Sequence, residues 1–177
     1  MLVKKVGLSL LFFFSTFVGA TSDWYQWSKV GQADFSVFIW DIYVSQLLSE
    51  EGTVNIQKPF AEQNIALVIQ YKRDITATKL LDATEDQWHG LGYPDDEIKH
   101  WSKNLAQVYP DIEEGDSLSY VSRSGAASFY FKAVGANEWN KVSNDLSPEF
   151  TNAFLSIWLS DDTQYPQQRR KLLGENK

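Results

Sequence analysis

The sequence predicts an α+β domain in which helices pack on one face of an antiparallel sheet. Segments dense in aromatic and β-branched residues occur before and after a central pair of helical segments, and two further helical segments end the chain. Short turn signals join the later strand-like segments, as in antiparallel hairpins. The 177 residues contain no internal repeat, linker or low-complexity segment. We therefore expect a single domain.

The first twenty residues have the pattern of a cleavable signal peptide. Lys4 and Lys5 precede an apolar run over residues 6–17, and small residues at 18–20 suit a signal peptidase. The apolar run is shorter than a membrane-spanning helix requires. We expect cleavage after Ala20, which would leave residues 21–177 as a periplasmic or secreted domain without a membrane anchor.

The amino-acid composition excludes several kinds of chemical site and of binding partner. The chain has no cysteine, so disulfides, thiolate nucleophiles, thiolate metal ligands and a lipid-modified cysteine are excluded. Removing Lys4 and Lys5 leaves 16 − 2 = 14 basic and 23 acidic side chains, a net charge of −9. Such a charge repels phosphate backbones, so nucleic acid is not an expected partner. The aromatic content of 15% indicates either an aromatic core or an apolar cleft.

Strand patterns dominate the first half of the mature chain. Residues 24–44 are expected to form two strands interrupted near Gly31, and residues 35–44 are apolar on both faces, which is typical of a central, covered strand. Residues 49–59 contain Gly52 and Pro59 and are predicted to form a loop. Residues 65–71 have the pattern of another strand.

Two helices are predicted next. Thr76 begins a segment whose apolar residues, including Leu80 and Trp88, keep to one broad side until glycines at 90 and 92 end it. A second helix is expected to begin at Asp95 or Asp96, and Pro110 is its stop signal. The apolar residues of this helix form one stripe.

The remaining elements are three short strands and two closing helices. Strands are expected over residues 118–121 and 129–134 and near 139–142, with a turn at residues 124–125. Ser147 is the expected N-cap of a helix that contains Pro148, and Phe150, Phe154 and Ile157 form part of its apolar face. Pro166 begins the last helix, which ends before Gly174.

Several of these motifs together carry a family resemblance. The run FLSIWLSDDTQYPQQRRKLLG at residues 154–174 resembles the end of the bacterial chalcone isomerase-like proteins. The Asp41-Ile42-Tyr43 strand end, the segment Tyr71 to Ile75 leading into a helix, and the acidic turn at residues 111–116 follow in the family's order. The resemblance implies a ligand cleft between the sheet and the helices, although fold alone does not establish activity.

The resemblance also assigns positions to a candidate site. The plant enzymes of the superfamily use a strand threonine, a tyrosine, an asparagine and a helix threonine, which correspond here to Phe38, Leu80, Gln87 and Ile157. Their arginine falls near residues 26–29, where this chain has none. Since most of these polar groups are replaced, the donors that would stabilise an oxyanion are lost.

We therefore expect a non-catalytic, exported protein that binds a small hydrophobic, fatty-acid-like molecule in a cleft lined by Phe38, Trp40, Leu80, Gln87 and Ile157. Two alternatives remain open: an isomerase or lyase with altered active-site residues, and an interaction protein with a filled core. No catalytic residue or cofactor is expected, and the sequence identifies no protein partner.

Other chemical signals have simpler interpretations. His89 and His100 lack a third ligand at metal spacing, so no metal site is expected. Arg73 beside Asp74 is interpreted as part of a strand-to-helix junction outside the cleft. The tryptophans raise the alternative of a carbohydrate-binding platform, but most of them fall on apolar faces and are interpreted as core. The tryptophans so interpreted are Trp40, Trp88, Trp101, Trp139 and Trp158.

Overall fold

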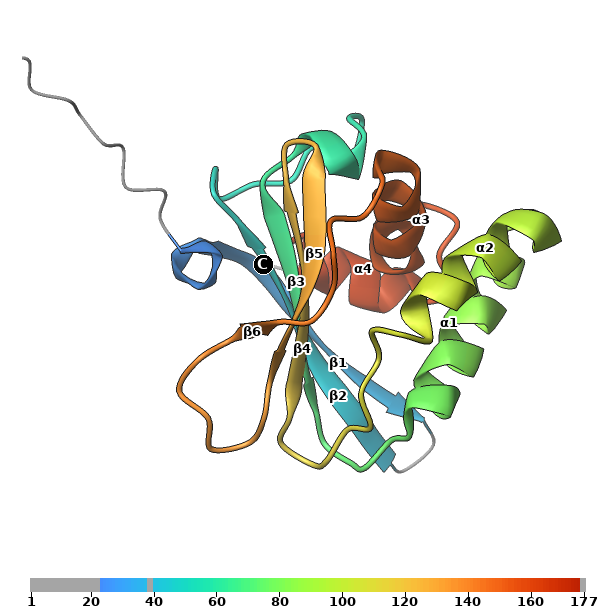
Figure 1. Ribbon diagram of the computed structural model, residues 1–177. Helices are drawn as coiled ribbons and strands as arrows, with labels where there is room; N and C mark the ends of the chain where they lie inside the picture. Colours follow the sequence, from blue (N-terminus) through green and yellow to red (C-terminus); the bar gives the residue numbers. More distant parts are fainter. Residues whose placement is uncertain (1–22, 38–39, 176–177) are drawn as a thin grey trace, which may run out of the picture.

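The sheet and helices form two layers. A computed structural model describes residues 23–37 and 40–175. Within these residues, six antiparallel strands lie in the order β1-β2-β3-β4-β5-β6, and four α-helices lie on one side of this sheet (Figure 1). The predicted α+β fold class is confirmed. The predicted signal peptide lies outside the described residues.

Each strand pairs with the next one along the chain. The strands are β1 (Ser28–Val37), β2 (Trp40–Ser49), β3 (Ile65–Tyr71), β4 (Ser117–Arg123), β5 (Ala126–Lys132) and β6 (Asn140–Lys141). The first two helices are inserted between β3 and β4, which still pair directly from Ile65–Ser122 to Gln70–Ser117. This insertion carries the chain from the sheet to the helical layer and back.

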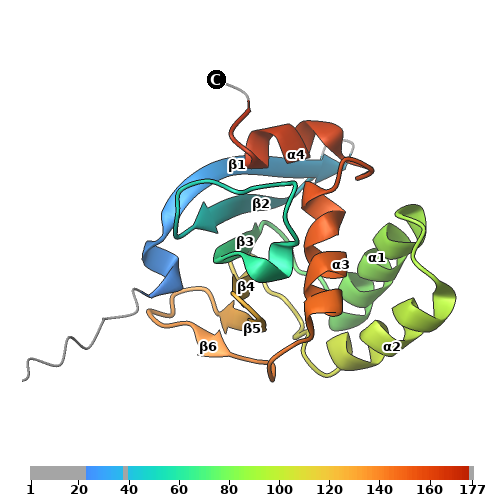
Figure 2. The ribbon, with the colours of Figure 1, turned by 90° about the horizontal axis from the view of Figure 1, so that it is seen from above.

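The helices begin where the capping signals indicate. They are α1 (Ala77–Gly90), α2 (Asp95–Leu105), α3 (Pro148–Leu159) and α4 (Pro166–Leu172), with short 3₁₀ helices η1 (Trp24–Gln26) and η2 (Phe60–Glu62). The Thr76 side chain accepts a hydrogen bond from Lys79 N, and the Ser147 side chain accepts one from Phe150 N. Figure 2 shows α3 between α4, which lies along β1, and the α1–α2 pair. No helix in the described ranges is both long and apolar enough to cross a membrane.

The prediction of a break near Gly31 is wrong. β1 continues through Gly31 with a register shift between Lys29 and Gly31, and the first hairpin instead joins Val37 to Trp40. A Cβ at position 31 would lie 2.1 Å from the carbonyl oxygen of Lys171. The glycine therefore permits the close approach of α4 and does not form a turn.

The apolar residues 35–44 do not form one central, covered strand as predicted. Residues 35–37 end the edge strand β1, whereas residues 40–44 begin β2, which lies between β1 and β3. Phe35 and Tyr43 stack across the two strands with ring centroids 4.9 Å apart. Their apolar character is explained by the cavity that they line.

Hydrophobic residues are buried on both sides of the sheet. The larger cluster lies between the sheet and the helices and contains Trp88, Tyr120 and Phe150. A smaller cluster on the opposite face contains Trp24 and Trp27, which precede β1, together with Leu48 of β2, Ala66 of β3 and Val121 of β4.

The tryptophans differ in their surroundings. Trp88 and Trp101 are buried as predicted, and Trp139 and Trp158 are partly buried. Trp40 is 55% exposed, so its assignment to the core is wrong. It lies at the start of β2, where its ring stacks with the Arg73 guanidinium, whose carbon is 4.5 Å from the ring centroid.

Candidate functional site

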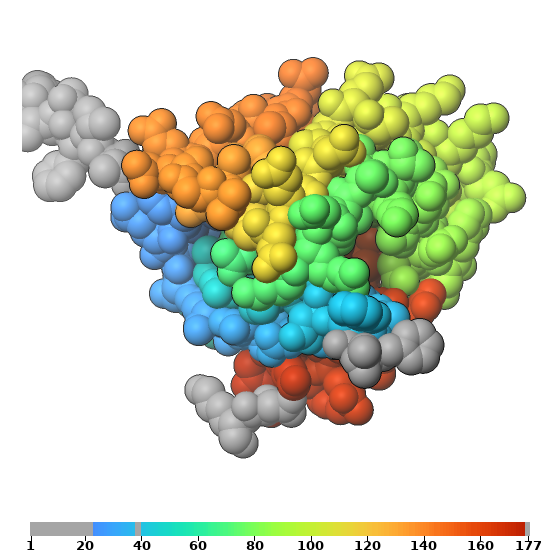
Figure 3. Space-filling model, turned by 90° about the horizontal axis from the view of Figure 1, so that it is seen from below, coloured from blue at the N-terminus to red at the C-terminus, as the bar shows by residue number. Residues whose placement is uncertain are grey.

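A cavity of about 290 Å³ lies between the sheet and the helices. Ile42, Tyr43, Ile69, Tyr71 and Leu118 form its sheet wall. Figure 3 shows a hollow between the green atoms of the α1 region and the red atoms of the C-terminal helices. The exposed residues Val37, Lys79 and Ala83 mark the cavity rim between β1 and α1.

Helical periodicity supplies the opposite wall. Leu80, Thr84 and Gln87 recur at positions i, i+4 and i+7 of α1 and all line the cavity. Helix α3 lines the cavity in the same way, with Phe154, Ile157 and Trp158. The cavity is therefore held by two regular helices on one side and by strands on the other, so its shape is largely fixed before any ligand binds.

Hydroxyl groups interrupt this apolar surface at separate points. The Tyr43 hydroxyl accepts a hydrogen bond from Trp158 Nε1 at 3.2 Å, and the hydroxyls of Thr84 and Tyr109 lie 3.1 Å apart. The Tyr165 hydroxyl accepts from Gln87 Nε2 at 3.3 Å. Each pair joins segments that are distant in the chain, and each hydroxyl also belongs to a residue of the cavity wall.

Burial raises the pKa of three cavity tyrosines, Tyr43, Tyr71 and Tyr109. It raises the pKa of Tyr43 to about 12, although the hydrogen bond from Trp158 opposes part of this rise. Burial also raises the pKa of Tyr71 and of Tyr109 above the ordinary tyrosine value. At neutral pH these groups are therefore uncharged hydroxyls that donate or accept hydrogen bonds and do not act as bases.

Charge is confined to the rim of this site. Among the described residues that line the cavity, Lys79 is the only one with a full charge at neutral pH, and it is exposed. A neutral, apolar group fits the interior, because an ion buried there would lose its hydration without gaining an opposite charge.

The structure brings together three of the five residues expected in the cleft. Leu80, Gln87 and Ile157 line the cavity. Trp40 does not line it and is largely exposed, because the hairpin directs it toward Arg73. Phe38 lies outside the described residues.

The tyrosines of the site were not predicted from the sequence. Tyr43, Tyr71, Tyr109 and Tyr165 come from separate segments and line one cavity. The resemblance pointed only to the positions that are functional in the plant enzymes, and most of these positions are apolar in this chain. For Tyr43 and Tyr71 the available signal was their placement on otherwise apolar strand segments, because a buried phenol usually needs a polar partner, whereas Tyr109 and Tyr165 lie outside the strands.

Other candidate sites have structural explanations. His89 and His100 are both exposed, and no group of three or more potential metal-ligating side chains occurs in the described chain. Asp116 is buried, and its carboxylate accepts hydrogen bonds from the backbone N–H groups of Glu113 and Val134, so it fixes a turn. Arg73 does not line the cavity.

Comparison with known proteins adds no functional assignment. No family model matches this chain. It is similar to an uncharacterized protein of Haemophilus influenzae, with 22% identity over 177 residues, which cover all of this chain and 80% of that protein. The function is therefore inferred from the geometry of the site.

Proposed function

We propose that this protein is an exported member of the chalcone isomerase-like fold that binds a small hydrophobic, fatty-acid-like molecule without converting it. The observation that carries the proposal is the apolar cavity between the sheet and helices α1 and α3. A filled core, as an interaction protein would have, does not account for a space of about 290 Å³ with an exposed rim. That volume lies just below the range of about 300–1,000 Å³ that is usual for ligand pockets.

Burial of an acyl chain supplies the binding free energy. Removing apolar surface from water contributes about 25 cal/mol per Å², and ordering the ligand offsets part of this gain. The aromatic and aliphatic side chains of Phe35, Leu80 and Ile157 suit such a chain.

The distribution of charge favours one orientation of the ligand. A carboxylate inside the cavity would meet neutral phenols, whereas at the rim it would remain hydrated beside Lys79. The proposed ligand therefore places its tail against α3 and its head group near the first turns of α1.

The same chemistry favours binding over catalysis. Tyrosines with a raised pKa stay protonated, so they are poor general bases at neutral pH. The described cavity wall offers no cation apart from Lys79 to stabilise a developing negative charge in the interior.

A thermal-shift experiment with a blocked cavity tests this proposal. Dodecanoic and hexadecanoic acids should raise the melting temperature of the purified protein, because a ligand that binds only the folded state stabilises it. Ala83→Trp places a large ring at the rim and should abolish the shift without disturbing the core, since Ala83 is exposed.

Asp82→Trp is the matched control. Asp82 is exposed on α1 and does not line the cavity, so this variant should keep the thermal shift. The proposal is wrong if neither acid stabilises the folded wild-type protein, or if both variants respond to the acids as wild type does.

A further inference from the structure

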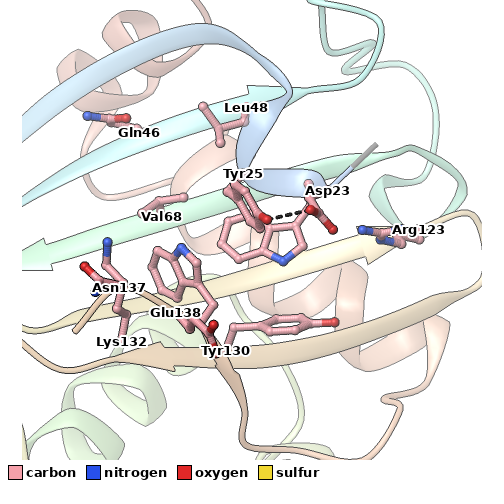
Figure 4. Close-up of a pocket in the computed structure, with 12 residues that line it drawn as sticks. Asp23, Tyr25, Gln46, Leu48, Val68, Arg123, Tyr130, Lys132, Asn137 and Glu138 are labelled. Carbon is pink, nitrogen blue, oxygen red and sulfur yellow. Dashed lines mark hydrogen bonds between the residues drawn. The ribbon is translucent and has the colours of Figure 1, made fainter. Parts of the chain in front are cut away.

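A second depression of about 700 Å³ lies on the face of the sheet opposite the helices. We call it the outer groove, and Figure 4 shows the side chains that line it. Leu48 and Val68 form its floor, and η1, β5 and the segment around Trp139 form its sides. The outer groove shares no lining residue with the cavity of the proposed function, so the two sites are independent.

A cluster of aromatic rings builds one side of the outer groove. Trp24 is buried and contacts Tyr25, Tyr130 and Trp139, with ring centroids 5.7, 5.4 and 4.9 Å from its own. Tyr25 is 49% exposed, and its hydroxyl donates a hydrogen bond to the Asp23 carboxylate (Figure 4). The exposed ring of Tyr25 is therefore held in place by Trp24 and Asp23 before a ligand arrives, which reduces the entropy lost on binding.

Polar groups of both signs surround these rings. Asp23 and Glu138 supply carboxylates, whereas Arg123 and Lys132 supply cations. The Lys132 Nζ atom lies 5.3 Å from the centroid of the Trp139 ring, which places this donor beside the aromatic side. Gln46 and Asn137 add side-chain amides, so the outer groove presents many hydrogen-bond donors and acceptors but little net charge.

We propose that the outer groove binds a neutral oligosaccharide. A sugar ring has an apolar C–H face that packs on aromatic rings and hydroxyls that both donate and accept hydrogen bonds. An ionic ligand would meet a like charge on one side of the outer groove whatever its sign. A purely apolar ligand would make no use of the surrounding carboxylates, amides and cations, whereas sugar hydroxyls can hydrogen-bond to them.

Titration calorimetry with maltotriose, cellotriose, chitotriose and mannotriose tests the proposal. At least one of these trisaccharides should bind the wild-type protein. Tyr25→Ala should weaken this binding by roughly tenfold, because it removes an exposed stacking face. Glu138→Gln should also weaken it, since it replaces a charged acceptor with a neutral amide.

Trp40→Ala is the control variant. Trp40 is also a largely exposed aromatic residue, but it does not line the outer groove, so the variant should bind the trisaccharide as wild type does. Circular dichroism should show that all variants are folded. The proposal is overturned if none of the four trisaccharides binds at millimolar concentration, or if Tyr25→Ala and Glu138→Gln leave the affinity unchanged.

Discussion

Trp158 Nε1 donates a hydrogen bond of 3.2 Å to the hydroxyl of Tyr43, which links α3 to β2 across the wall of the cavity. The Tyr43 ring stacks on Phe35, and Phe35 contacts Tyr165 edge to face. This chain of contacts connects the first hairpin, α3 and the segment before α4. The same residues that hold these elements together also shape the cavity.

Stability should fall at alkaline pH. Burial raises the pKa of Tyr43 in the folded state from 10.0 to about 12, so the unfolded chain loses this proton first as the pH rises. The stabilising contribution is present below about pH 10 and is lost as the pH rises to about 12. Urea denaturation of wild type and Tyr43→Phe across this range tests the prediction. The variant should show a smaller decrease in the free energy of unfolding, and an equal decrease would contradict it.

Thr84→Val should destabilise the helical layer. Its hydroxyl donates to the Leu80 carbonyl and lies 3.1 Å from the hydroxyl of Tyr109, which would lose its partner. An unsatisfied buried hydroxyl costs about 1–3 kcal/mol in the free energy of unfolding. Thr78→Val is the control, because Thr78 is exposed on the same helix and the change in helix propensity is the same. Equal effects of the two substitutions would show that the Thr84–Tyr109 contact contributes nothing.

Gly31→Ala should separate α4 from β1. The new Cβ would lie 2.1 Å from Lys171 O and 2.3 Å from Leu172 O, and the backbone would have to move. We expect a loss of about 3 kcal/mol in the free energy of unfolding, with faster hydrogen exchange in α4.

Gly92→Ala is the comparison for this steric effect. The Cβ that it adds would have no atom within 4 Å, but Gly92 has a φ of +82°. It should cost only about 1–2 kcal/mol and leave exchange in α4 unchanged. Normal exchange in α4 of Gly31→Ala would contradict the packing argument.

Lys79→Gln should weaken the binding of dodecanoic acid, because it removes the rim cation near the proposed head-group position. A rim ion pair that remains solvated contributes about 0.2–1 kcal/mol, so the affinity should fall by only a few fold and the effect should decrease with added salt. Lys103→Gln changes the net charge equally at a position outside the cavity and should have no effect. Binding affected equally by both substitutions would indicate a general charge effect.

Local signals were enough to predict most elements of the fold. β3 spans the predicted residues 65–71, and Thr76 and Ser147 cap α1 and α3 as expected. These features depend on residues that are close in sequence, such as a capping hydroxyl and the N–H group three residues later. The short turn at residues 124–125 was predictable for the same reason.

Features that depend on distant contacts could not be predicted in this way. Gly31 has the appearance of a turn glycine, and only the position of α4 explains it. Trp40 and Trp88 both lie in apolar segments of the sequence, yet Trp40 is exposed and Trp88 is buried. Trp40 stands at the hairpin end of β2, whereas Trp88 stands on the face of α1 that packs on the core. The tyrosines of the cavity come from four segments, so their convergence required the tertiary structure.

The most direct test of the proposed function is a crystal structure of the protein with ω-bromododecanoic acid, in which anomalous scattering locates the bromine at the end of the acyl chain. Our account predicts a bromine peak inside the cavity near Phe154 and Ile157, with the carboxylate at the rim near Lys79. A bromine peak in the outer groove or on the surface, together with an empty cavity, would contradict it.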